Sequence, residues 1–285
     1  MITALARGDE TPHLLDSAAA NDVSIEPYPH MVRHGALQAD AYVALATEFP
    51  SLDDILNGRK DYGNNEAVRM TARQVLTENR VSRQWQDFFS YHTSQEYWKQ
   101  ITRLFAPHFR LEFPGLEERV GRAYEDWRVV PRGFAGDADV RLDCQFVMNT
   151  PVTQASSVKT PHIDLCDKIF SSLLYFRSPD DLVSGGDLDL YAWHRAPRFI
   201  KHRVLNTDID LVKTVPYAAN SFVCFVNSAR AVHGVSPRGL TSMPRRYINF
   251  IAELPIDAFT PKQIGRWQKL WLSRDVKLAA NNDKY

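Results

Sequence analysis

The 285 residues are long enough for one or two domains, and 44% hydrophobic with 24% charged residues describes a globular rather than a disordered chain. Lysine plus arginine and aspartate plus glutamate each number 34, so no global positive charge attracts nucleic acid or an anionic membrane. The three cysteines, Cys144, Cys166 and Cys224, form no CxxC pair, which argues against a disulfide framework or a zinc ribbon and favours a reducing compartment.

The sequence shows no targeting or membrane-spanning segment. The first ten residues carry Arg7, Asp9 and Glu10 and lack the apolar region of a secretory signal. No run approaches the roughly 18 apolar residues of a transmembrane helix. We therefore expect a cytoplasmic protein.

The first half of the chain favours helices. Residues 1–24 are rich in alanine, aspartate and serine and are predicted to form a flexible arm. Apolar residues at helical spacing predict helices over 39–49 and 82–106, and a shorter one within 117–127. The polar, glycine-bearing segment 57–66 is typical of a long loop, and such loops often act as lids.

From about residue 140 the pattern changes to short strands without intervening helices, which is typical of an antiparallel sandwich or barrel. The strand-like runs are 140–149, 169–176, 187–191, 211–215, 221–226 and 246–254.

A helix is predicted again over 261–278, where a tryptophan stripe favours packing on the β core or a homodimer contact, and 279–285 is a polar tail. Helices, a β core over about 140–255 and a last helix together predict an α+β protein with a double-sheet or jelly-roll core. We expect a single domain over 25–278.

His162 and Asp164 are candidate metal ligands. On an extended segment residues i and i+2 share a face, so the imidazole and the carboxylate can reach the same point. His233 follows the strand-like run 221–226, and a barrel could bring it back beside the pair. Two histidines and a carboxylate make the facial triad of non-haem iron(II) oxygenases, but zinc sites use the same ligand types. The ligands alone therefore do not name the metal.

The order of motifs around this pair is more specific than the pair itself. Thr160-Pro161-His162-Ile163-Asp164 is followed by the apolar run 169–176, by Gly185-Gly186-Asp187-Leu188, by His233 and by a basic-headed last strand. Over residues 140–254 this order resembles the iron(II)- and 2-oxoglutarate-dependent dioxygenases, in their prolyl-4-hydroxylase-like branch. The resemblance implies a cupin-like double-stranded β-helix with helices packed on it, and it implies His162, Asp164 and His233 as the iron ligands.

The resemblance also implies a basic residue that binds the distal carboxylate of 2-oxoglutarate, for which a guanidinium fork is suited. Arg246 is our first candidate, because it precedes the last strand and shares a face with Ile248 and Phe250. Arg238 is the second, and Arg245, of opposite strand parity, is the third. Arg246 lies a few residues further from the distal histidine than the family pattern, which leaves the choice among the three open.

Asn149 and Tyr175 are weaker candidates for the 2-oxoglutarate site, because related enzymes use a polar residue on an early core strand. Asn149 equally fits a turn before Pro151, and Tyr175 equally fits an ordinary core position.

The function that the resemblance implies is an enzyme with iron(II), 2-oxoglutarate and O2. Because Asp164 is present, where halogenating relatives have a small residue, hydroxylation of an unactivated C–H with release of succinate is favoured. Desaturation, ring formation and epimerisation stay open. We expect a small-molecule substrate, such as an amino acid, a sugar or a natural-product intermediate, and neither nucleic acid nor membrane as partner.

Two other functions fit the sequence. One is a jelly-roll binding or interaction module without turnover. The other is a cupin-like metalloenzyme with zinc or manganese that does not use 2-oxoglutarate.

Overall fold

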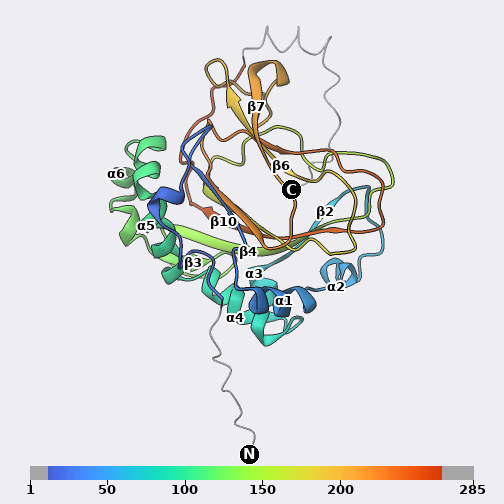
Figure 1. Cartoon of the computed structure of the whole chain (residues 1–285). Coiled ribbons are helices and arrows are strands. Elements are labelled where there is room, and N and C mark those ends of the chain that lie inside the picture. The colour runs from blue at the N-terminus through green and yellow to red at the C-terminus, as the bar shows by residue number, and fades with distance from the viewer. Residues whose placement is uncertain (1–11, 265–285) are drawn as a thin grey trace, which may run out of the picture.

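The computed structural model describes residues 12–264, which form two β-sheets and a layer of helices (Figure 1). The strands are β1 (His30–His34), β2 (Ala67–Thr71), β3 (Val129–Pro131), β4 (Val140–Asn149), β5 (Lys168–Tyr175), β6 (Leu188–Trp193), β7 (Ile209–Val215), β8 (Ser221–Val226), β9 (His233–Val235) and β10 (Arg245–Glu253). The large sheet has the order β1-β8-β5-β10-β4-β2, with β3 beside β4, and the small sheet has the order β7-β6-β9.

The chain alternates between the two sheets, and this alternation defines the fold. After β4 in the large sheet it crosses to His162, which forms an isolated bridge with His233 beside the small sheet. It returns for β5, crosses for β6 and β7, returns for β8, crosses for β9 and ends on β10 between β4 and β5. This is the topology of a double-stranded β-helix, so the α+β class with a jelly-roll core is confirmed.

Helices cover the face of the large sheet that points away from the small sheet (Figure 1). They are α1 (Ala39–Thr47), α2 (Leu52–Leu56), α3 (Ala72–Thr77), α4 (Arg83–His92), α5 (Gln95–Glu112) and α6 (Leu116–Val120), with 3-10 turns at Ala20–Asp22, Tyr124–Asp126 and Asn206–Asp208.

The single helix predicted over 82–106 is two helices, α4 and α5. The hydroxyl of Ser94 accepts a hydrogen bond from the backbone N–H of Tyr97 and caps the start of α5. Aromatic side chains fix both helices on the sheet, as where the ring of Trp85 lies 4.6 Å from that of Phe146. Cys144 and Cys224 are fully buried in the same layer.

The described part of the N-terminal segment differs from the flexible arm that we expected over 1–24. Leu14 and Leu15 are 0% exposed and belong to the main hydrophobic core. Arg103 donates to the carbonyl of Leu15, and Arg33 donates to that of Leu14. Burial of two leucines outweighs the loss of backbone freedom, so the segment packs.

At the other end, the helix predicted over 261–278 lies largely outside the described residues, and the tail 279–285 lies outside them entirely. Residues 261–264 are not helical, and Gln263 forms a parallel bridge with Phe199. Within residues 12–264, none of the helices combines the length and the apolar character needed to span a membrane.

Candidate functional site

The fold brings His162, Asp164 and His233 together, as expected. The backbone N–H of each histidine donates to the carbonyl of the other, at 2.9 and 3.0 Å, so the two segments run side by side. The centroids of the two imidazole rings are 4.3 Å apart. One potential ligand atom from each of the three residues lies within 4.8 Å of the others, a spacing that one metal ion can bridge.

Backbone carbonyls fix the tautomer of both imidazoles. Nδ1 of His162 lies 2.7 Å from the carbonyl of Thr160, and Nδ1 of His233 lies 2.9 Å from that of Ala231. A carbonyl only accepts, so Nδ1 carries the proton in each ring and Nε2 keeps its lone pair. The buried Nε2 of His162 has no hydrogen-bond partner among the described residues. Such an orphaned acceptor fits a metal ligand.

The electrostatics of the cluster suit a cation. Burial lowers the pKa of His162 to about 3, and it also lowers the pKa of His233, so both rings are neutral at physiological pH. Burial opposes ionisation of Asp164, but the positive charges of Lys159 and Lys168 favour the carboxylate, and the pKa of this carboxyl lies well below its usual range. The site therefore presents two neutral nitrogens and one carboxylate.

The two oxygens of Asp164 have different surroundings. Oδ2 accepts a hydrogen bond of 2.8 Å from the hydroxyl of Ser171 on β5. Oδ1 faces the cluster, 3.6 Å from Nε2 of His162, 3.8 Å from Nε2 of His233 and 3.6 Å from Nζ of Lys159. Oδ1 is therefore the oxygen placed to bind a metal.

Asn227 and Ser171 orient this carboxylate, and the sequence reasoning missed both. The side-chain oxygen of Asn227 accepts from the backbone N–H of Asp164, and its amide donates to the carbonyls of Leu165 and Lys168. An asparagine directly after the apolar run 221–226 is the sequence signal that could identify it. Ser171 lies within an apolar strand and carries no comparable signal.

A buried arginine, Arg245, lies at the first residue of β10. It donates from Nε to the carbonyl of Gly186, from Nη1 to Oδ1 of Asn149 and from Nη2 to the hydroxyl of Tyr175. All three acceptors are neutral, and no acidic side chain among residues 12–264 forms an ion pair with this 2% exposed arginine. Its guanidinium carbon lies 4.6 to 5.0 Å from the ring centroids of Tyr175, Tyr217 and Tyr247.

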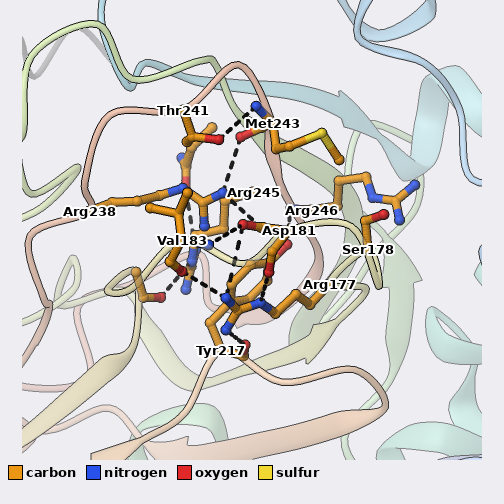
Figure 2. Close-up of polar contacts among 12 residues, drawn as sticks. Arg177, Ser178, Asp181, Val183, Tyr217, Arg238, Thr241, Met243, Arg245 and Arg246 are labelled. Carbon is orange, nitrogen blue, oxygen red and sulfur yellow. Dashed lines mark hydrogen bonds and ion pairs between the residues drawn. The ribbon is translucent and has the colours of Figure 1, made fainter.

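Arg246, our first candidate for the carboxylate site, lies on the other face of the sheet. It does share a face with Ile248 and Phe250, as expected, but that face packs against the helices. Its Nε donates to the carbonyl of Phe176, and Figure 2 shows its side chain directed away from the cluster around Arg245. Because successive residues of a strand point to opposite faces, Arg245, the third candidate, points away from the helices and towards Gly186.

The remaining candidates lie near Arg245. Asn149 and Tyr175 both contact it, so neither is an isolated turn or core residue. Arg238 is also buried and pairs with Asp181 at 2.7 Å.

One apolar cluster connects the metal-ligand cluster with Arg245. It contains Phe225, whose ring lies 4.7 Å from that of His233, and it contains Tyr175 and Tyr247 beside Arg245. Ser171, which holds Asp164, and Tyr175 are four residues apart on one face of β5, roughly 13 Å.

The polar loop 57–66 contacts the segment that leads from β4 to His162. Oδ1 of Asn64 accepts from the backbone N–H groups of Thr153 and Gln154, and the amide of Asn65 donates to the carbonyl of Ser156. A lid role for the loop stays a prediction.

No family model matches this chain, and no curated protein matches it. Among solved structures, it is similar to a Pseudomonas putida prolyl-4-hydroxylase, with a TM-score of 0.45 and 13% identity over 84% of this chain and 98% of that one. A prolyl 4-hydroxylase from Phytophthora capsici has a TM-score of 0.47 and 14% identity, over 86% of this chain and 70% of that one. The epimerase SnoN, solved with Fe3+ and alpha-ketoglutarate, has a TM-score of 0.45 and 13% identity, over 83% of this chain and 91% of that one.

Proposed function

We propose that the protein is an iron(II)- and 2-oxoglutarate-dependent oxygenase. The observation that carries the proposal is the convergence of His162, Asp164 and His233, whose ligand atoms lie within 4.8 Å of one another. Three ligands on one face of an octahedron leave adjacent positions free for a co-substrate and for dioxygen.

The donor set fits the metal. His162 and His233 present neutral Nε2 atoms, and Asp164 presents Oδ1. When bound, iron(II) with 2-oxoglutarate supplies the oxidation of an unactivated C–H by O2, with release of succinate and CO2. The chain contributes the ligand geometry, the placement of substrate and a largely water-excluded interior.

Arg245 is the proposed partner of the distal carboxylate of 2-oxoglutarate. A buried guanidinium without a carboxylate partner among residues 12–264 is suited to bind an anion, and an anion at Arg245 would lie across the apolar cluster from the metal ligands. Asn149 and Tyr175 orient the guanidinium. This second subsite favours a 2-oxoglutarate enzyme over a cupin-like metalloenzyme that uses zinc or manganese alone.

We further propose that the reaction is hydroxylation of a small molecule. The carboxylate of Asp164 leaves no ligand position for a halide, which supports hydroxylation over halogenation.

The test is the loss of metal and turnover together. In protein purified without oxygen, His162→Ala and Asp164→Ala should each abolish binding of iron(II) and succinate formation with 2-oxoglutarate over a panel of metabolites. His194→Ala is the matched control, because this exposed histidine pairs with Asp210 outside the cluster. Full activity in the variant that lacks both His162 and Asp164 would refute the proposal.

A further inference from the structure

A lysine lies against the metal-ligand cluster. Nζ of Lys159 is 3.6 Å from Oδ1 of Asp164. The same oxygen lies 3.6 Å from Nε2 of His162 and 3.8 Å from Nε2 of His233. The ammonium group and a metal ion bound to the two imidazoles would therefore share one carboxylate oxygen.

Hydrogen bonds hold Lys159 at this place. Its carbonyl accepts from the backbone N–H of Val235 at 2.9 Å, and its own N–H donates to Oγ of Ser157 at 3.2 Å. That hydroxyl donates in turn to the carbonyl of Val235 at 2.6 Å. Val235 is the last residue of β9, and the ligand His233 is the first. The segment that carries the lysine is thus fixed to the strand that carries a ligand.

Without metal, this ion pair favours the folded protein. The side chain of Asp164 is 16% exposed and that of Lys159 is 31% exposed, so water screens their attraction only in part. A carboxylate in such a place is costly to leave without a positive partner. The ion pair therefore stabilises the ionised ligand before a metal ion arrives.

With metal, the same ammonium has the opposite effect. A divalent cation at Oδ1 of Asp164 repels the ammonium, and it takes the oxygen with which the ammonium is paired. Metal binding must then offset the loss of the ion pair if Lys159 turns away, or the repulsion if Lys159 stays. Either way, an interaction that stabilises only the metal-free state lowers the metal affinity by the same free energy.

We infer that Lys159 competes with the metal ion for Asp164, so that its ammonium supports the metal-free site and weakens the binding of divalent metal. Lys159 is thus a positioning residue that acts through Asp164, and it is not a ligand. The inference rests on the proposed function for the place of the metal ion, and it adds a residue that sets the metal concentration at which the site fills.

Calorimetric titration of the metal-free protein with cobalt(II), without 2-oxoglutarate and without O2, tests the competition in the absence of turnover. Lys159→Met removes the charge and keeps the length of the side chain. It should tighten cobalt(II) binding about fivefold, the upper end of the usual effect of a partly exposed ion pair. Damage to the site would instead weaken binding, so the sign of the change separates competition from a structural role.

Three further variants complete the test. Lys159→Gln should shift the affinity in the same direction, and it covers the case in which the methionine variant does not fold. Lys159→Arg keeps the charge and should bind cobalt(II) with nearly wild-type affinity. Lys99→Met is the matched control, because Lys99 is exposed on α5 in the helical layer, on the other side of the large sheet (Figure 1). It should leave the dissociation constant unchanged.

Thermal unfolding gives the second readout. Without metal, Lys159→Met should melt about 2–4 °C below the wild type, and excess cobalt(II) should narrow the difference because it stabilises the variant more. Unchanged or weaker cobalt(II) binding in folded Lys159→Met and Lys159→Gln would overturn the inference, while succinate formation by the wild type would leave the proposed function in place. If loss of the charge tightens metal binding but no succinate forms from 2-oxoglutarate with iron(II) and O2, the proposed function fails and the competition stands.

Discussion

At the scale of single residues, the site depends on which oxygen of Asp164 stays free. Ser171 engages Oδ2, and Asn227 holds the backbone of the same residue, so Oδ1 is directed at the two imidazoles. Groups that orient a ligand tune metal affinity without touching the metal.

Ser171→Ala should therefore lower iron(II) affinity about tenfold, because Asp164 loses the hydrogen bond that fixes its rotation. Titration of the metal-free protein under anaerobic conditions measures this. The free energy of unfolding should change by less than about 1.5 kcal/mol, the value of one hydrogen bond.

Asn227→Ala provides the contrast. It removes three hydrogen bonds at a buried position, so it should lower both the iron(II) affinity and the free energy of unfolding, the latter by about 2–4 kcal/mol. An unchanged iron(II) affinity in both variants would show that Asp164 needs no support.

The sequence predicts the spatial cluster of His162, Asp164 and His233. It does not predict which of the adjacent residues Arg245 and Arg246 points away from the helices. The HxD spacing fixes a shared face on any extended segment. Arg245 and Arg246 are adjacent on a strand, so the sequence shows only that their side chains point to opposite faces of the sheet. Which face is interior depends on the helices that cover Ile248 and Phe250, and that packing is a tertiary property.

At the scale of elements, α4 and α5 enclose polar atoms against the large sheet. His92, at the last residue of α4, is 1% exposed, and its Nδ1 lies 2.8 Å from the carbonyl of Phe88. Its Nε2 has no partner among the described residues, and the same holds for the hydroxyls of Tyr97 and Ser172. Protonation of the His92 ring would place a positive charge among aromatic side chains.

A pH dependence of stability follows from His92. Burial lowers its pKa to about 3 in the folded state, whereas an unfolded histidine titrates near 6.5. The unfolded state thus binds more protons, and stability falls as the pH drops from about 6.5 towards 3. Between pH 7 and pH 5 the free energy of unfolding of the wild type should fall about 2 kcal/mol more than that of His92→Gln. Urea unfolding at both pH values measures it, and parallel pH profiles would contradict it.

The break between α4 and α5 shows why element boundaries escape sequence reasoning. Apolar residues continue across residues 93 and 94 at near-helical spacing, so the pattern predicts one helix. Ser94 nevertheless caps a new helix, because its hydroxyl satisfies a backbone N–H that the turn leaves free.

Strand β2, which pairs with β4, is not predicted from the sequence. It has only five residues after a polar loop, and so short a run shows little alternation of apolar and polar side chains.

At the scale of the whole molecule, the described N-terminal segment joins the helical layer to the large sheet. Arg103 on α5 and Arg33 on β1 both donate to carbonyls of this segment, next to two buried leucines. The core therefore includes residues that are more than eighty positions away along the chain from some of their contacts.

Leu14→Ala and Leu15→Ala should each lower the free energy of unfolding by about 2–5 kcal/mol, the usual range for a leucine removed from a packed core. Denaturant unfolding measures the loss. Val43→Ala, at a side chain that is 60% exposed on α1, is the control and should change it by less than about 0.5 kcal/mol. Equal effects at all three positions would mean that the segment does not pack as described.

Two buried thiols, Cys144 on β4 and Cys224 on β8, lie in the core between the large sheet and the helices, so their reactivity reports on opening of this part of the protein. Cys144 and Cys224 are 0% exposed, and burial raises the pKa of both, so an alkylating reagent meets neither accessible sulfur nor thiolate in the closed fold. Labelling at these positions requires the helices to lift from the sheet. The labelling rate, followed by mass spectrometry in strong and weak denaturant, should follow the equilibrium for opening of the helices. Rapid labelling in plain buffer would mean that the helices are already separated from the sheet in the native protein.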